Sequence, residues 1–376
     1  MIETNFKHTD IGVIPHDWEV RIIKDFADIT TGSQNTQDRI DNGEYPFFVR
    51  SSKVERINKY IFDTEGVITA GDGVGTGKIY HYINGKFGLH QRCYLVYNFE
   101  RVSAKYFYRI FGQHFYDRVQ GMTAKSSVDS VRMEMIADMP IPLPPTLAEQ
   151  EKIANALSKI DQLINDLGAL IEKKKAIKQG TMQDLLTAKR RLKGFTGEWK
   201  EKQLKEICER YDNLRIPISA KLRKKGNTPY YGANGIQDYV EGYTHDGEFI
   251  LIAEDGANSL TNYPIKYVIG KIWVNNHAHV ITAKDEKTNN VYLSYAFKCV
   301  DFESNIVGSG RAKLNADTLM QLSVVIPPTL AEQNAIANIL SSMDTEITNL
   351  EQKRDKYIAI KQGMMQNLLT GKIRLI

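Results

Sequence analysis

Two stretches of the chain carry apolar residues at alternating spacings of four and three, with polar residues between them. This is the a/d spacing of a coiled coil, whose single apolar stripe must be covered by another helix. We therefore expect two long helices that pair through these residues. The first stripe consists of Ile153, Leu157, Ile160, Ile164 and Leu167, and it continues to Ile171. The second consists of Ile336, Leu340, Met343, Ile347 and Leu350, after which Arg354 interrupts it.

Both helices are expected to begin directly after a Pro-Pro pair. Thr146 and Glu149 stand three residues apart after the first pair, and Thr329 and Glu332 after the second. In such a capping box the threonine side chain accepts a bond from a free backbone N–H of the first turn, and the glutamate bonds back to the cap residue. The sequence therefore predicts helix starts at these two points.

The two helices are expected to form an antiparallel coiled coil with each other. Each stripe covers only about three heptads, so either helix alone would be marginal in water. A helix of about 35 to 40 residues is on the order of 55 Å long, comparable to one or two turns of DNA. The residues at which the helices end are not determined by the sequence, because glycine weakens a helix interior and Gly180 and Gly363 could interrupt the two helices.

The helical stretches belong to a long internal repeat. Residues 144–192 and 327–375 align without a gap at an offset of 183 and share 29 identities over 49 positions. Upstream the likeness is weaker, but Asp72 still aligns with Asp255 at the same offset. Such a repeat predicts a pseudo-twofold molecule, the single-chain analogue of a symmetric dimer. We expect two globular regions at 1–143 and 194–326 and two helical spacer regions at 144–193 and 327–376.

Both globular regions are expected to be mixed α/β (α+β) domains of one fold. Short runs of β-branched and aromatic residues between Gly, Asn and Asp predict strands, and helical stretches are expected to follow them. Two unrelated domains that merely share a linker sequence are the alternative. The expected strands include residues 94–97, 249–252 and 279–282, and the expected helices include residues 103–112 and 291–300.

The composition is that of an ordinary globular protein. Hydrophobic residues make up 42% and charged residues 25% of the 376 positions, so a packed core can form and global disorder is excluded. No stretch approaches the roughly 18 apolar residues of a membrane span, and a signal-peptide pattern is lacking. Three scattered cysteines favour a reducing cytoplasm. The net charge of +4 permits nucleic-acid binding without arguing for it.

Motifs for catalysis, nucleotide binding or metal binding fit the chain poorly. The glycine-rich run 71–78 matches neither phosphate-binding pattern, and a tight turn between strands is expected there. His277 and His279 could offer two metal ligands, but no companion is evident, and a polar surface pair on a strand is expected. We predict no metal site, no bound cofactor and no catalytic residue.

A basic segment follows the first apolar stripe. Residues 172–193 contain eight Lys or Arg residues and two acidic residues. The segment is either a solvated face that complements the helix dipole or a surface that contacts phosphates or a protein partner.

Polar residues in the turns of both globular regions match what the reading of base edges requires. Arg and Lys can address the acceptors of guanine, Asn and Gln can bond adenine at two atoms, and others can hold phosphates. The candidates in the first region are Ser33, Gln34, Asn35, Arg50, Ser52, Lys53, Gln91 and Arg92. Those in the second region are Arg215, Lys221, Arg223, Lys224, Lys225, Asn234, Gln237, Asn275, Asn276 and His277.

The chain as a whole resembles the specificity (S) subunits of type I restriction–modification systems over essentially its full length. Ile14, Pro15 and Trp18 match the opening I-P-x-x-W of that family, and a P-P-x-x-x-E-Q motif opens each long helix. Both repeats also end in I-x-Q-G-x-M-Q-x-L-L. The opening of the second half, at residues 195–199, departs from the pattern because it lacks the Ile-Pro.

This resemblance implies a non-catalytic subunit with two target-recognition domains, each of which reads one half of a bipartite, gapped sequence in double-stranded DNA. The paired helices would set the gap and bind two methyltransferase (M) subunits, which use S-adenosylmethionine to methylate adenine. Restriction (R) subunits that use ATP and Mg could join, and no membrane is involved. Because the globular regions have diverged, we predict two different half-sites. The alternative is a coiled-coil scaffold that binds protein rather than DNA.

Overall fold

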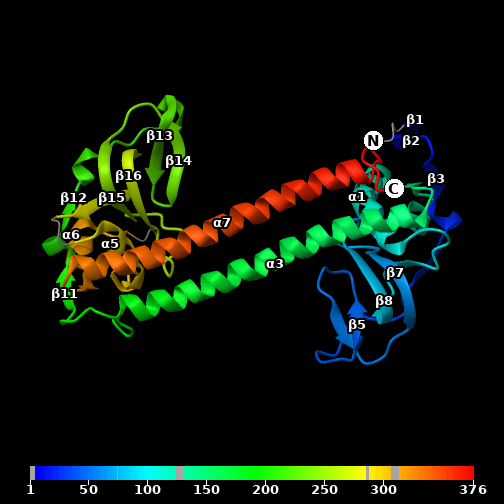
Figure 1. Ribbon diagram of the computed structural model, residues 1–376, viewed down its shortest axis with the longest axis horizontal. Helices are drawn as coiled ribbons and strands as arrows, with labels where there is room; N and C mark the ends of the chain where they lie inside the picture. Colours follow the sequence, from blue (N-terminus) through cyan, green and yellow to red (C-terminus); the bar gives the residue numbers. More distant parts are fainter. Residues whose placement is uncertain (1–4, 74, 124–129, 285–287, 306–312) are drawn as a thin grey trace. The chain divides into compact units, whose positions relative to one another are not determined.

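The structure is a computed structural model that describes residues 5–73, 75–123, 130–284, 288–305 and 313–376 (Figure 1). The chain forms two compact units. The first comprises Met1–Gly168 and Lys353–Ile376, and the second comprises Ala169–Gln352. Each unit contains one globular region together with part of each long helix. The finer division into four parts stays a prediction.

The first unit contains a six-stranded sheet. Its strands are β4 (Asp28–Thr31), β5 (Tyr45–Phe48), β6 (Glu55–Ile57), β7 (Phe62–Ala70), β8 (Tyr80–Leu89) and β9 (Cys93–Tyr97). They follow the spatial order β4-β9-β7-β8-β5-β6, and all neighbours are antiparallel except the parallel pair β5 and β8. The described part of the glycine-rich run 71–78 connects β7 to β8, as expected.

The second unit contains a sheet of the same design. Its strands are β12 (Cys208–Arg210), β13 (Lys225–Gly232), β14 (Gly235–Val240), β15 (His245–Ala253), β16 (Ile265–Val274) and β17 (Ala278–Ala283). Their order is β12-β17-β15-β16-β13-β14, and the single parallel pair is β13 and β16. Each strand therefore has a counterpart at the same place in the other sheet, which confirms two mixed α/β domains of one fold.

Each globular region begins and ends in a small two-stranded sheet. The antiparallel pairs are β3 (Glu19–Ile22) with β10 (Pro140–Leu143), and β11 (Lys200–Gln203) with β18 (Ser323–Ile326). This pairing joins the two ends of each region directly before the Pro-Pro of a long helix. The remaining short strands and α-helices are β1 (Phe6–Thr9), β2 (Gly12–Pro15), α2 (Met133–Ala137), α4 (Leu204–Ile207) and α6 (Ala316–Gln321).

The helix that covers each sheet differs in length between the units. Helix α1 (Ala104–Thr123) has 20 residues, and its counterpart α5 (Asn290–Ala296) has 7. In α1 the buried rings of Phe107, Phe111 and Phe115 stack along one face, with centroids 5.2 and 4.3 Å apart. This face packs against the sheet in one continuous apolar cluster. Helices at both positions confirm the expectation from the sequence.

The two long helices are α3 (Leu147–Leu186) and α7 (Leu330–Leu368), with 40 and 39 residues. Both begin directly after the expected threonines. Both continue without interruption through Gly180 and Gly363, where an added Cβ would meet no other atom within 4 Å. The described part of the chain has no helix that is long and apolar enough to cross a membrane.

The threonine half of each capping box is present, and the glutamate half is not. The backbone N–H of Glu149 donates to Oγ1 of Thr146 at 3.2 Å, and that of Glu332 donates to Oγ1 of Thr329 at 3.3 Å. The side chains of both glutamates are buried and bind arginines instead of the cap residue. The expected reciprocal bond is therefore wrong, because a charged partner competes for the carboxylate.

Each of these glutamates binds the arginine that follows the carboxyl end of the other long helix. Arg374 donates to the two carboxylate oxygens of Glu149 at 2.5 and 2.8 Å, and also to both oxygens of Asp17. Arg191 donates to the two oxygens of Glu332, both at 2.8 Å. The two arginines are related by the repeat offset of 183, as are the two glutamates. The pseudo-twofold repeat is thus visible in individual contacts.

Ion pairs between α3 and α7 follow the same rule. In the first unit Lys361 lies 2.6 Å from Asp161, and in the second unit the repeat-related Lys178 pairs with Asp344. Together with the contacts of Glu149 with Arg374 and of Arg191 with Glu332, these pairs bring the amino-terminal part of one helix beside the carboxyl-terminal part of the other in each unit, so the helices run antiparallel, as predicted. Lysines of the basic segment therefore pair with acidic residues of α7, an arrangement that neither expectation for that segment had included.

The apolar stripes are covered by the globular regions as well as by the opposite helix. Ile153 and Leu157 are fully buried in the cluster that contains α1, and Leu340 is buried beside Tyr292 of α5. Among the remaining residues of the stripes, Ile160, Leu167, Ile336 and Ile347 are buried and Ile164, Met343 and Leu350 are half-buried.

Candidate nucleic-acid interface

In the first unit one carboxylate gathers two arginines at the loop between β8 and β9. Asp72 follows β7, Arg50 follows β5, and Arg92 lies directly before β9. Nη1 of Arg50 lies 2.6 Å from one oxygen of Asp72, and Nη1 of Arg92 lies 2.8 Å from the other. The arginine side chains are 39% and 59% exposed, so the group faces solvent with an excess of positive charge.

The arginines keep this carboxylate ionised. Burial raises the pKa of Asp72, but the hydrogen bonds from Arg50 and Arg92 outweigh burial and hold the pKa below its usual value. The neighbouring His90 is buried, and its pKa is lowered by that burial and by the two guanidinium groups. The loop therefore carries its positive charge on the two arginines and not on the histidine.

Two amide side chains beside this group have different roles. Nε2 of Gln91 donates to Oδ1 of Asn35 at 2.6 Å, on the exposed side of the loop. Gln34 is buried, where it accepts from the backbone N–H of Leu89 at 2.9 Å and donates to the carbonyl of Lys59 at 2.8 Å. Gln34 therefore uses its amide inside the domain, whereas Gln91 and Asn35 remain at the surface.

The second unit places a different set at the equivalent loop, between β16 and β17. Nδ1 of His277 lies 2.6 Å from Oδ1 of Asp255, the repeat partner of Asp72. Asn275 is buried and accepts from the backbone N–H of His277 at 2.8 Å. Its Nδ2 lies 3.4 Å from Oε1 of Gln237, while Asn276 is exposed. A histidine and amides thus replace the two arginines of the first unit.

Asn234 braces the neighbouring loop. Its Oδ1 accepts from the backbone N–H of Asn258 and its Nδ2 donates to the carbonyl of Gly256, both at 2.9 Å. The side chain is nevertheless exposed, so one edge of the loop remains accessible.

The basic candidates of the second unit separate into inward-facing and exposed side chains. Arg215 donates to Glu254 at 2.6 Å and to the carbonyl of Ala278 at 2.9 Å. Arg223 lies over the ring of Tyr230, 4.1 Å from its centroid. Lys221, Lys224 and Lys225 are exposed, as are Ser33, Ser52 and Lys53 of the first unit.

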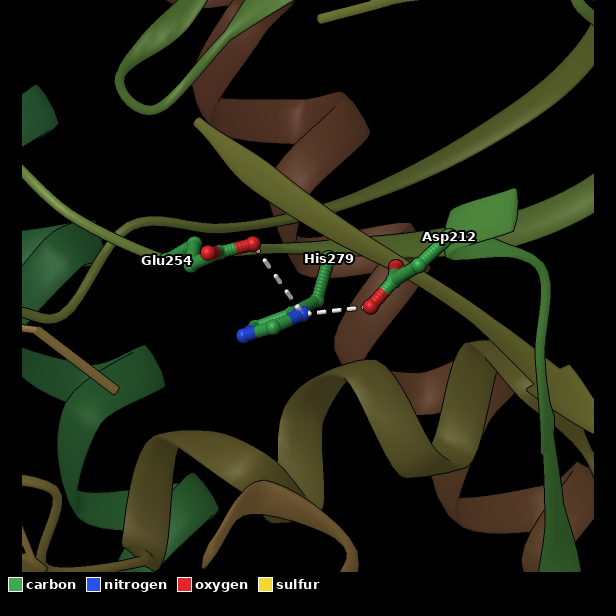
Figure 2. A group of neighbouring side chains, drawn as sticks. All are labelled: Asp212, Glu254 and His279. Atoms are coloured by element: carbon green, nitrogen blue, oxygen red, sulfur yellow. Dashed lines mark hydrogen bonds and ion pairs between the residues drawn. The ribbon is translucent and has the colours of Figure 1, made fainter. Parts of the chain in front are cut away.

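Arg215 belongs to a charged group around His279, and Figure 2 shows His279 with the two carboxylates of this group, Asp212 and Glu254. Nδ1 of His279 lies 2.7 Å from Asp212 and 3.6 Å from Glu254. Only 1% of His279 is exposed, so the expected surface pair of histidines on a strand is wrong. The alternation of exposed and buried positions along a strand did not predict this burial. The segment η3 (Asp212–Leu214) covers this face of β17, and the carboxylate of Asp212 accepts from the backbone N–H of Val280.

This group could in principle hold a metal ion, since ligand atoms of Asp212, Glu254 and His279 lie within 4.8 Å of one another. The donors are already engaged. Nε2 of His279 bonds the carbonyl of Leu314 at 2.8 Å, and Arg215 and Lys313 both bind Glu254. Burial raises the pKa of Glu254, but bonds from the two cations outweigh it and lower the pKa. Two cations therefore balance two carboxylates without a metal.

The acidic residues that organise both loops were not among the sequence candidates. Asp72 and Asp255 are the missed pair, although their alignment at the repeat offset was visible in the sequence. Both also form a single antiparallel bridge, with Ser130 and Lys313 respectively. A repeated acid beside repeated glycines was the signal that could have found them. Whether the candidates contact bases stays a prediction.

Both halves of the chain match a known protein family. A family model for the type I restriction modification DNA specificity domain matches residues 15–179 and again residues 196–359. The two matches coincide with the two halves of the internal repeat.

Individual relatives agree with the family model. A putative type I restriction enzyme specificity subunit of Haemophilus influenzae is 49% identical over 152 residues, which cover 40% of this chain and 38% of that protein. The putative MjaX specificity subunit of Methanocaldococcus jannaschii is 28% identical over 99% of this chain and 97% of that protein. The crystal structure of a type I S subunit from M. genitalium has a TM-score of 0.73 at 17% identity, covering 98% and 97%. That last similarity concerns the fold.

Proposed function

The chain belongs to the family of type I restriction modification DNA specificity domains, and we propose that it is the subunit that selects the DNA sequence in a type I complex. The observation that carries this proposal is the same sheet built twice with different polar side chains at the same loop. Two readers of one design with different contacts suit a bipartite target with two different half-sites.

Within this function the chain binds DNA and partners and performs no chemistry itself. Two methyltransferase subunits would dock on the helical regions and transfer methyl groups from S-adenosylmethionine to adenine, and restriction subunits with ATP and Mg could join. The exposed arginine, lysine and amide side chains of both units are the kinds of groups that bond base edges and phosphates. The antiparallel helices would set the separation of the two half-sites.

Single-molecule methylation sequencing tests this proposal directly. The DNA would come from cells that carry the cognate methyltransferase subunit with and without this chain. We expect a bipartite adenine-methylated motif with two unlike halves only when the chain is present. Failure to find any motif, with the methyltransferase subunit shown to be active, would contradict the proposal.

A coiled-coil scaffold that binds only protein is the second candidate, because α3 and α7 carry many exposed charges. Salt dependence separates the two candidates. Binding of duplex DNA through phosphates weakens with salt at a log–log slope of about −0.9 per contact, whereas a protein scaffold would show no duplex binding to weaken.

A further inference from the structure

We propose that Asp72 is a positioning residue that presents Arg50 and Arg92 to guanine in the half-site read by the first unit. This inference rests on the proposed function and deepens it, because it names a base and a position in the chain. It follows from the geometry of the three side chains and from their contrast with the second unit.

Each arginine uses only part of its guanidinium group on Asp72. Nη1 of Arg50 donates to one carboxylate oxygen of Asp72, and Nη1 of Arg92 donates to the other. Among the residues that the structure describes, the Nε and Nη2 atoms of Arg50 and Arg92 have no hydrogen-bond partner. Guanine offers N7 and O6 as a pair of acceptors, and a guanidinium group that keeps two donors matches this pair.

The backbone fixes the carboxylate before DNA arrives. Asp72 is held by its bridge to Ser130, and the preceding Gly71 donates its N–H to the carbonyl of Arg92 at 2.8 Å. A side chain larger than hydrogen at Gly71 would come within 2.8 Å of that carbonyl, so the two segments approach as closely as they can. A flexible arginine held in this way loses less conformational entropy when it binds, which is the general benefit of preorganisation.

The second unit supports the assignment by contrast. There Asp255 holds the ring of His277, and the residue equivalent to Arg50 at the repeat offset of 183 is Ala233. No guanidinium group contacts Asp255 among the described residues. The same carboxylate position therefore presents two arginines in the first unit and one imidazole in the second. Guanine is assigned to the first half-site because, within the described part of the chain, only the first unit holds guanidinium groups at this position.

The test uses the full chain in complex with its cognate methyltransferase subunits. Methylation rates would be measured on the natural duplex and on duplexes with each base pair of either half-site substituted. The Asp72→Asn variant should lose about 5- to 150-fold discrimination at one or two guanines of the first half-site. Its discrimination in the second half-site should be unchanged, and Asp72→Glu should restore part of the loss. The matched control is Asp63→Asn, an exposed carboxylate on β7, the strand that precedes Asp72.

A second variant protects the test if Asp72→Asn does not fold. Arg92→Lys keeps the charge and removes the two-pronged donor, so it should lose discrimination at the same guanine. A first half-site without guanine would overturn the inference. So would a uniform loss over all sequences, which indicates phosphate contact. Both results leave the proposed function intact, whereas a wild-type complex with no bipartite motif would remove the function itself.

Discussion

The two globular regions of this chain share their framework and differ at the loop that precedes the last strand of each sheet. Strand order, the single parallel pair and the glutamate–arginine contacts at the helix ends occur twice. The loop itself carries Arg92 beside Asp72 in one unit and His277 beside Asp255 in the other. Duplication has thus preserved the parts that position the loop and allowed the contacting side chains to change.

A second difference lies beneath these loops. In the first unit the hydroxyl of Tyr94 donates to the carbonyl of Val131 at 3.1 Å. In the second, His279 occupies the equivalent strand position and bonds the equivalent carbonyl, that of Leu314, at 2.8 Å. A Cβ at Gly71 would lie 3.1 Å from the ring of Tyr94, so a glutamate like Glu254 has no room there. The bond to the equivalent carbonyl is therefore made by the neutral phenol of Tyr94 in the first unit. In the second unit it is made by His279, which also contacts charged residues.

The largest expected effect comes from a charge in the helix pair. Ile160→Asp should destabilise the protein by about 4 kcal/mol or more, because it buries an unpaired carboxylate in the first unit. Its repeat partner Met343 is half-buried, so Met343→Asp should cost less. Chemical denaturation and assembly with methyltransferase subunits would measure both. Variants that are as stable as the unsubstituted protein and that still form a fully active complex would contradict the helix pairing.

The arginines at the helix ends come next. Arg374→Ala and Arg191→Ala should each cost about 3 kcal/mol, because each leaves one buried glutamate without its partner. Near-equal values would support the repeat symmetry of these contacts. The exposed Lys372→Ala, two residues from Arg374, is the control and should change the free energy of unfolding by less than about 0.5 kcal/mol.

The bonds beneath the loops should differ in strength between the units. His279→Ala should cost about 3 kcal/mol, since it leaves the half-buried carboxylate of Asp212 without its hydrogen bond to the imidazole. Tyr94→Phe removes one neutral bond and should cost about 1 kcal/mol. Thermal unfolding of both variants would check this order, and a larger loss for Tyr94→Phe would refute it.

Recognition by the second unit gives a smaller and more selective effect. Asn276→Ala should weaken recognition by about 1–3 kcal/mol at one base pair of one half-site, if the exposed amide reads a base. Methylation rates on singly substituted duplexes would measure it. A loss spread evenly over all sequences would assign Asn276 to phosphate contact, and no change would make it an ordinary hydrated side chain.

Moderately acidic pH should lower the folding stability of both units. This loss should be the smallest of the expected effects. Burial raises the pKa of Asp161 and of Asp212, but their hydrogen bonds to Lys361 and His279 respectively outweigh it and lower both pKa values. A carboxyl whose folded pKa is depressed contributes stability above its unfolded pKa and loses it as the pH falls. The contribution of these two carboxylates to the stability measured by urea unfolding should therefore be complete above about pH 5 and decline below it. A rise in stability below pH 4 would contradict these carboxylate assignments.

The sequence predicted the long helices well because their pattern is local. The apolar spacing and the threonines before Leu147 and Leu330 were sufficient to place both helix starts, and the internal repeat led to the antiparallel pairing. The carboxyl ends stayed open because glycine propensity is a weak signal. Tertiary packing against the globular regions carried both helices through Gly180 and Gly363.

The site could be predicted only in part because its contacts are long-range. Arg92 and His277 were found as polar turn residues, but the carboxylates that hold them lie about twenty positions away in the chain. The burial of His279 depends on Asp212, which is 67 residues away. No local pattern contains that information. The repeat alignment of Asp72 with Asp255 pointed only to the two loop carboxylates.

The central claim is that two equivalent frameworks carry two different readers. A chain in which residues 18–143 replace residues 199–326, joining tryptophan onto tryptophan, tests it most directly. Once its assembly with the methyltransferase subunits is established, methylation sequencing should give an interrupted palindrome made of the first half-site twice. A motif that still contains the original second half-site would contradict the claim, because recognition would then reside outside the exchanged domain.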